Sequence, residues 1–149
     1  MDRAIIRRAT SGDLPGLLEL FRHLNPDDPA LAPADAEAIW GTLLHSGLIT
    51  VLVAESDGML AATCTLAIIP NLTRGARPFG VIENVVTRPE HRRRGLGHAV
   101  LTEALSVAWA AGCYKVMLAT GSRRPETLRF YERAGFERGG KTFFQARRP

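Results

Sequence analysis

Apolar residues occur along the chain in runs that predict three neighbouring strands. Residues 49–55 and 60–69 are rich in Val, Ile, Leu and Thr, and the compact turn signal Ser-Asp-Gly at 56–58 separates them. Two such runs joined by a short turn that contains glycine predict a β-hairpin. A third run at 79–87 follows the turn-rich connection 70–78. Because all three runs are largely apolar, we expect an antiparallel meander with both faces covered.

Other stretches place apolar residues at helical spacing. The predicted helices run from a cap at Thr10 or Ser11 to the break at Asn25, and over 33–46, 94–111 and 125–134. Further strands are predicted over 3–8, 114–119 and 142–146, with Phe136 in another short strand. The third helix separates the strands at 79–87 and 114–119, and this order predicts a right-handed parallel crossover.

These elements predict an α/β fold in a single domain that spans residues 1–149. The expected sheet is mixed, and six or seven strands and about four helices build the domain. A chain of 149 residues suits one sizeable core, and no repeat, low-complexity tract or linker divides it.

Composition excludes several classes of protein. A hydrophobic content of 46% and a charged content of 23% are ordinary for a soluble globular protein. No apolar run reaches membrane-spanning length, and the first ten residues lack the apolar core of a signal peptide. Cys64 and Cys113 have no metal-ligand spacing, so we expect buried thiols in the reducing cytoplasm, with neither a metal site nor a membrane contact.

The formal net charge of +4 is unevenly distributed. Basic residues gather at 88–94 and 123–148, which suits a polyanionic ligand. A nucleic-acid-binding module is one alternative, but the first basic run leads into an apolar helix, and no aromatic stacking platform accompanies it. We therefore expect no nucleic-acid partner.

The first basic run has the form of a phosphate-binding loop. It follows a strand and opens a helix, where unpaired backbone N–H groups and the helix dipole favour anions. Neither the Walker loop nor the complete dinucleotide fingerprint is present. The residues expected to hold phosphate are Arg92, Arg93, Arg94, Gly95, Leu96, Gly97 and His98, the last through its backbone N–H. His91, just before them, is expected to face solvent.

The loop 92–97 reads R-x-x-G-x-G and resembles the pyrophosphate signature of the GNAT superfamily of N-acetyltransferases. Residues 130–136, Phe-Tyr-Glu-Arg-Ala-Gly-Phe, resemble the later F-Y-E-x-x-G-F motif of the same family. The short strings at 82–86 and 112–115 are most similar to its glucosamine-6-phosphate N-acetyltransferase branch. The resemblance covers about residues 79–137, and it reaches the N-terminal half by general layout.

The resemblance implies acetyl-CoA as co-substrate, no metal, and direct transfer of an acetyl group to a primary amine. It implies that the strands at 79–87 and 114–119 splay apart at the cofactor site. Backbone groups of Val85, Val86 and Thr87 would then pair with the pantetheine arm, and the N–H of Val86 would polarise the thioester carbonyl. Arg124 stands where the family often has an asparagine that holds pantetheine, so it could bind phosphate or acceptor instead.

Two side chains are candidates for moving protons. Glu83 lies on an otherwise apolar strand, where desolvation would strengthen it as a general base, and a purely structural carboxylate is the alternative. The family motif implies that Tyr131 protonates the coenzyme A sulfur, whereas packing against the sheet is its other possible role.

The acceptor amine is less clearly specified. The family layout places the first two helices along the acceptor site, which makes Phe21, Asn25 and Trp40 substrate candidates. Arg74 and Arg77 in the loop 70–78 could reach an anionic acceptor or a partner subunit. A small-molecule amine is the expected substrate, and family habit implies a homodimer. A protein or peptide amine, or an acyl-CoA sensor without turnover, are the alternatives.

Overall fold

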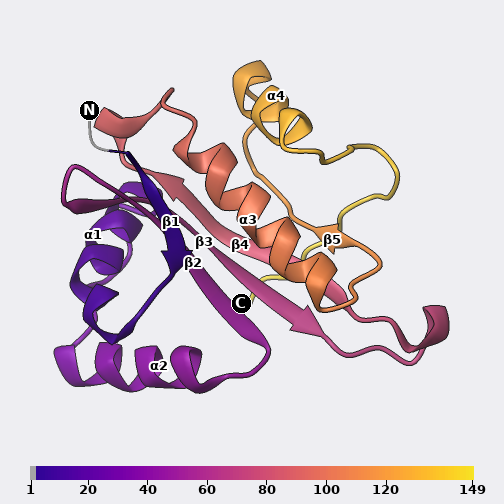
Figure 1. Cartoon of the computed structure of the whole chain (residues 1–149), viewed down its shortest axis with the longest axis horizontal. Coiled ribbons are helices and arrows are strands. Elements are labelled where there is room, and N and C mark those ends of the chain that lie inside the picture. Colours follow the sequence, from indigo (N-terminus) through magenta and orange to yellow (C-terminus); the bar gives the residue numbers. More distant parts are fainter. Residues whose placement is uncertain (1–2) are drawn as a thin grey trace. The chain divides into compact units, whose positions relative to one another are not determined.

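The computed structural model describes residues 3–149 and forms two compact units, one ending at Leu118 and the other spanning Ala119–Pro149. The first unit contains a five-stranded sheet (Figure 1). Its strands lie side by side in chain order: β1 (Ile5–Arg8), β2 (Ile49–Ser56), β3 (Met59–Ile69), β4 (Phe79–Thr87) and β5 (Val116–Met117). Strands β1 to β4 are antiparallel and β5 is parallel to β4, so the predicted meander and parallel pair are confirmed.

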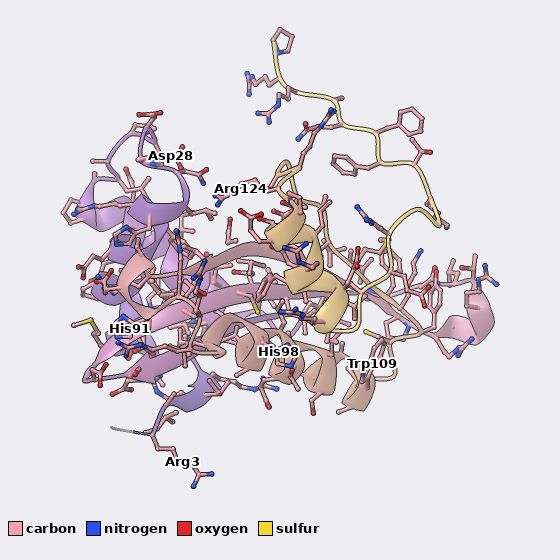
Figure 2. The ribbon with its side chains drawn as sticks, turned by 90° about the horizontal axis from the view of Figure 1, so that it is seen from above. Arg3, Asp28, His91, His98, Trp109 and Arg124 are labelled. Atoms are coloured by element: carbon pink, nitrogen blue, oxygen red, sulfur yellow. The ribbon has the colours of Figure 1, made fainter. Side chains whose placement is uncertain are left out.

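Helices cover both faces of this sheet. Helices α1 (Leu14–Leu24) and α2 (Pro33–His45) lie on one face, and α3 (Leu96–Ala110) crosses the other (Figures 1 and 2). Side chains alternate between the faces along each strand. Val53 of β2 therefore packs with Leu17 and Trp40, while Cys64 of β3 points its Sγ toward the carbonyl of Val100 in α3.

Local chemistry explains where the helices begin and end. Helix α1 follows a short 3-10 turn, η1 (Ser11–Asp13), and the backbone N–H of Thr10 donates to the Asp13 carboxylate at 2.7 Å. This capping contact satisfies a group that has no intrahelical partner. Helix α3 ends just before Gly112, whose φ of 85° lies in the left-handed region that glycine tolerates. Among residues 3–149, no helix is long and apolar enough to cross a membrane.

Two β-bulges interrupt the regular pairing of the sheet. In β3, Ala61 is an extra residue between the pairs Ala54–Ala62 and Glu55–Leu60. In β4, the pairs Thr65–Glu83 and Thr63–Val86 leave two residues, Asn84 and Val85, opposite one. Asn84 has a φ of 54°, a left-handed conformation that asparagine adopts more readily than most residues. The second bulge lies in the middle of the strand that leads to the predicted phosphate-binding loop.

The second unit contains α4 (Pro125–Arg133), and the four predicted helices are therefore all present. The predicted sheet of six or seven strands is wrong, because the sheet has five. The strand expected over 114–119 has only two residues, and the segments around Phe136 and over 142–146 form no strand in the described part of the chain. A strand needs a neighbour for its backbone hydrogen bonds, and the residues described in this unit contain no other strand.

Candidate active site

The segment between β4 and α3 has the geometry of an anion-binding loop. Arg92, Arg93 and Arg94 are exposed, and Gly95 precedes the first helical residue, Leu96, which is buried. Gly95 has a φ of 76°, and a Cβ built on it would meet no atom within 4 Å. The approach to this helix N-terminus is therefore open, and no side chain caps it. The free N–H groups and the arginine side chains can together bind phosphate oxygens.

A buried arginine fixes the start of this segment. The Arg88 side chain is only 7% exposed, although it carries a full charge. Its Nε donates to the carbonyl of Leu60 at 3.1 Å, and one terminal nitrogen donates to the Glu19 carboxylate of α1 at 3.0 Å. Burial of a charge is costly unless it is paired, and these contacts supply the pairing. Sequence patterns did not reveal this structural role for Arg88.

The expectation that His91 faces solvent is wrong. His91 ends a 3-10 turn, η3 (Pro89–His91), and is only 4% exposed. Its Nε2 lies 3.2 Å from Oδ2 of Asp57, the turn residue between β2 and β3. Arg94 donates to the same oxygen at 3.1 Å, and this bond is the main reason that the pKa of Asp57 is lowered. The hairpin residue that contacts His91 is 34 positions away in sequence, so local patterns could not reveal the burial of His91.

Several predicted site residues lie on the short stretch of β4 around its bulge. Val86 is buried, Val85 and Thr87 are half-buried, and Glu83 and Asn84 are exposed. The desolvation expected for Glu83 is therefore absent, since this side chain is open to solvent. A bulge also disturbs the regular ladder of backbone hydrogen bonds. The stretch thus combines a disturbed backbone with a solvent-accessible carboxylate.

An apolar cavity of about 160 Å³ lies beside this stretch, between α1, α2 and the sheet. Phe21, Trp40 and Asn84 are among the residues that line it. Trp40 is also a core residue, and its indole N–H donates to the carbonyl of Ser11 at 3.3 Å. Asn25 follows α1 and does not line the cavity. Of the three candidates from the helical wall, two therefore reach the cavity next to the bulge.

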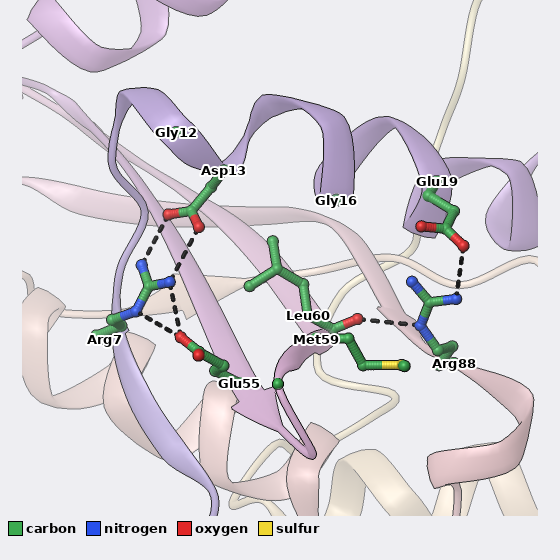
Figure 3. Close-up of a pocket in the computed structure, with 10 residues that line it drawn as sticks. Arg7, Gly12, Asp13, Gly16, Glu19, Glu55, Met59, Leu60 and Arg88 are labelled. Carbon is green, nitrogen blue, oxygen red and sulfur yellow. Dashed lines mark hydrogen bonds and ion pairs between the residues drawn. The ribbon is translucent and has the colours of Figure 1, made fainter.

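A second cavity, of about 290 Å³, is lined by paired charges (Figure 3). Arg7 donates to both oxygens of Asp13 at 2.7 and 2.9 Å and pairs with Glu55 at 3.0 Å. The hydrogen bond from Arg7 is the main cause of a lowered pKa for Asp13. Because these charges satisfy one another, we interpret them as a clamp that holds the start of α1 on the sheet.

The loop between β3 and β4 carries a cluster of cations around one aromatic ring. The guanidinium carbons of Arg74 and Arg77 lie 5.8 and 5.7 Å from the centre of the Tyr114 ring, and the Lys115 ammonium lies 5.4 Å from it. Lys115 is also 5.7 Å from the ring of Phe79, at the start of β4. Cation–π contacts hold the charges together without neutralising them. This Tyr114 cluster is thus a concentrated positive surface.

The remaining candidates belong to the second unit. Tyr131 is half-buried on α4, and its ring makes edge contacts with Phe130 and Phe136 at centroid distances of 4.9 and 6.4 Å. Arg124 is exposed at the helix N-cap and pairs with Glu126 at 2.7 Å. Within residues 3–149, no group of three or more His, Cys, Asp or Glu side chains could hold a metal ion.

The predicted residues therefore fall into distinct groups. The first unit contains the predicted phosphate-binding loop and the stretch at 83–87, which are continuous in the segment from β4 to α3. His98 lies exposed in the first turn of α3, as Figure 2 shows. Arg74 lies before β4, at the opposite end of that strand from the loop. Arg124 and Tyr131 are described within their own unit.

Comparison with known proteins identifies the family of this chain. Residues 15–136 match the acetyltransferase (GNAT) family. A glucosamine 6-phosphate N-acetyltransferase from Trypanosoma brucei brucei is 34% identical over 132 residues, which cover 88% of this chain and 87% of the relative. A solved structure from Agrobacterium tumefaciens is 49% identical with a TM-score of 0.91, and an acetyltransferase from Trypanosoma brucei is 31% identical with a TM-score of 0.82. Each of these two comparisons covers 97% of this chain and 99% of the other. The chain belongs to the acetyltransferase (GNAT) family of enzymes.

Proposed function

We propose that this enzyme transfers the acetyl group of acetyl-CoA to the amine of glucosamine 6-phosphate. The observation that carries the proposal is the 34% identity, over most of both chains, to a relative named for that reaction. The family match alone is compatible with many amines, so the choice of acceptor depends on this relative and on the charge distribution of the chain.

The donor side of the proposal is supported by the fit of the loop 92–98 to a pyrophosphate. The open space at Gly95 and the exposed side chains of Arg92 and Arg93 suit a bulky anion. The thioester of acetyl-CoA supplies an activated acetyl group when bound. The backbone of Val85 and Thr87 would align the pantetheine arm, and the N–H of Val86 would donate to the thioester oxygen.

Two side chains would move the protons of the reaction. The amine nitrogen bonds to the acetyl carbon as the carbon–sulfur bond breaks, so the amine loses a proton and the sulfur gains one. Glu83 is exposed beside the bulge, and we assign its carboxylate to accept the amine proton through water. We assign the Tyr131 hydroxyl to protonate the sulfur, on the strength of the family motif. Tyr131→Phe should leave the affinity for coenzyme A intact and lower kcat, and an unchanged kcat would remove Tyr131 from this role.

The acceptor side is supported by the Tyr114 cluster, because a sugar phosphate needs cations. Phe79 lies beside the Tyr114 cluster, and the bulge at Val85 is six residues further along β4. At the usual rise of a strand, roughly 20 Å separates the bulge from the cluster. An amino-sugar phosphate is shorter than this span. We therefore propose a homodimer in which Arg74 and Lys115 of one copy face the acceptor bound by the other. Phe21 and Asn25 remain candidates for contacts to the sugar, and the two free cysteines agree with a cytoplasmic location.

Thiol release in the presence of acetyl-CoA tests the acceptor. Glucosamine 6-phosphate, glucosamine and a lysine-containing peptide would be compared at equal concentration, with coenzyme A binding measured by calorimetry. A much higher kcat/KM for glucosamine 6-phosphate than for glucosamine is expected, since the phosphate adds charge-assisted contacts. Preference for the peptide would replace the small-molecule acceptor, and binding without turnover on any amine would favour an acyl-CoA sensor.

A further inference from the structure

The tip of the β2–β3 hairpin lies against the segment that forms the phosphate-binding loop. Asp57 is the first turn residue there and has a left-handed φ of 55°. One of its oxygens, Oδ2, lies 3.2 Å from His91 Nε2 and 3.1 Å from the Arg94 guanidinium. A single carboxylate oxygen therefore joins two side chains that are three positions apart.

The contact with His91 joins a buried imidazole to a carboxylate that is 49% exposed. His91 is 4% exposed, and its other ring nitrogen, Nδ1, is buried without a hydrogen-bond partner. An ionised carboxylate can only accept, so Nε2 is the nitrogen that carries the hydrogen. A buried polar side chain with only half of its hydrogen-bonding groups satisfied is rare. The bond to Asp57 is thus the one polar contact of the imidazole ring among the residues that the structure describes.

The contact with Arg94 fixes the other end of the same segment. Arg94 directly precedes Gly95, the N-cap of α3, so a bond at Arg94 sets the position of the helix start. Arg92 and Arg93 lie between the two fixed ends and are exposed. Neither of them has an ion-pair partner among residues 3–149. Asp57 therefore holds a short stretch at both ends and leaves its two central arginines available to a ligand.

We propose that Asp57 is a positioning residue of the donor site, which orients the loop through His91 and Arg94 for the phosphates of coenzyme A. This inference rests on the proposed donor. The inference predicts the direction in which the affinity for coenzyme A changes when Asp57 is replaced. By Coulomb's law alone, removal of a negative charge beside a phosphate site should tighten the binding of a polyanion. Removal of a positioning contact should weaken it instead, because the arginines lose their preset geometry.

Two substitutions test the proposal without disturbing the turn. Asn and Gly both tolerate a positive φ, so Asp57→Asn and Asp57→Gly keep the backbone conformation of the hairpin. We expect Asp57→Gly to lower the affinity for coenzyme A, measured by calorimetry, by about tenfold, the effect of one charge-assisted contact. Asp57→Asn retains an acceptor oxygen, so its effect should be smaller. At saturating acetyl-CoA, kcat should be unchanged.

Two comparisons separate positioning from a general loss of structure. S-acetylpantetheine lacks the pyrophosphate, so its kcat/KM should be the same in wild type and in Asp57→Gly. Glu90→Gln is the matched charge control, because Glu90 is an exposed carboxylate of the same segment and lies 3.8 Å from Arg88. It should leave coenzyme A affinity unchanged or slightly tighter. His91→Gln keeps a donor near the Nε2 position and should bind coenzyme A better than His91→Leu does.

The outcomes distinguish this inference from the proposed function. If the wild-type protein does not bind coenzyme A, the donor itself is wrong and the inference is overturned with it. If the wild type binds and Asp57→Gly binds equally well or more tightly, the donor stands and the positioning role is overturned. An equal loss with coenzyme A and S-acetylpantetheine, accompanied by a lower Tm, would also overturn it, since Asp57 would then act on the whole fold.

Discussion

Two arginine-rich loops lie at opposite ends of β4, and they hold their positive charge in different ways. In the loop before α3, Arg88 is buried and donates to a carbonyl and a carboxylate, and Arg94 pairs with Asp57. In the loop before β4, Arg74 and Arg77 lie around the ring of Tyr114. The first loop therefore uses two of its arginines in structural contacts and leaves Arg92 and Arg93 exposed. The second keeps its cations together on an aromatic ring and leaves their charge unpaired.

Arginine content alone therefore does not reveal what a loop does. A rigid backbone with selected free arginines suits a ligand that also binds N–H groups, such as a pyrophosphate at a helix N-terminus. A set of unpaired cations around an aromatic ring suits a ligand that needs charge with little geometric demand. The substitutions below test whether the two loops serve the two ends of the reaction, the donor and the acceptor.

The largest effect is expected from Gly95→Glu in the loop before α3. Gly95 has a left-handed φ and faces open space, so a glutamate would add backbone strain and place a negative charge where phosphate should bind. We expect coenzyme A affinity to fall by roughly 100-fold or more, the sum of two lost or reversed charge contacts. Calorimetry would measure it, with Gly95→Ala as the control for strain alone. Unaltered binding would place the phosphate elsewhere.

A matched pair, Arg88→Met and Arg93→Met, sharpens the contrast inside that loop. Arg88→Met leaves the carbonyl of Leu60 without its buried donor, so the free energy of unfolding should fall by about 2 kcal/mol. Arg93 is exposed, so Arg93→Met should leave stability within about 0.5 kcal/mol of wild type and weaken coenzyme A binding instead. Urea denaturation and calorimetry would measure the two effects. A reversed pattern would contradict the assignment of structural and binding arginines.

The double substitution Arg74→Gln with Arg77→Gln tests the other loop. If the Tyr114 cluster binds the phosphate of the acceptor, KM for glucosamine 6-phosphate should rise by about tenfold, as expected for loss of charge-assisted contacts. KM for glucosamine and for acetyl-CoA should not change, because neither needs this cluster. Steady-state thiol-release kinetics would measure all three constants. An equal rise for glucosamine would assign the loop a role other than phosphate recognition.

The smallest effect is expected on stability, from loss of the contact between Arg7 and Asp13. Its bond to Asp13 lowers the pKa of that carboxyl below the ordinary value of 3.8. The stabilisation is therefore complete above the unfolded-state pKa and is lost as the pH falls through the folded-state pKa. Asp13→Asn should lower the free energy of unfolding by about 1 kcal/mol at neutral pH and by less near about pH 3. Asp28→Asn, at an exposed position, is the control, and a deficit that grows in acid would contradict the linkage.

Sequence patterns predicted the helices and the open loop before α3 well, because these depend on local chemistry. The helix predicted over 33–46 is observed at Pro33–His45, and proline and glycine signals explain such agreement. The burial of Arg88 and His91 could not be predicted, because it depends on a hairpin that is distant in sequence. The pattern at 142–146 suggested a strand, but pairing requires a neighbour, and alternation in the sequence cannot supply one.

The exposure of Glu83 is another case in which the pattern misled. Most of the residues around it in the strand are apolar, so desolvation of the carboxylate was expected. A strand position is buried only if its face is covered there, and the side chain of Glu83 is exposed. Local composition predicted the strand, but it did not predict which of its side chains reach water.

The bulge in β4 determines how related sequences must be aligned along this strand. Ile82 pairs with Leu66, on the same face as Cys64 and α3, whereas Val86 belongs to the cluster around Leu17 on the opposite face. Both are even-numbered residues of one strand, so the extra residue at the bulge exchanges the two faces. A gap placed in the wrong half of β4 would therefore assign residues to the wrong face of the sheet, and deletion of Asn84 would turn over one whole arm of the strand.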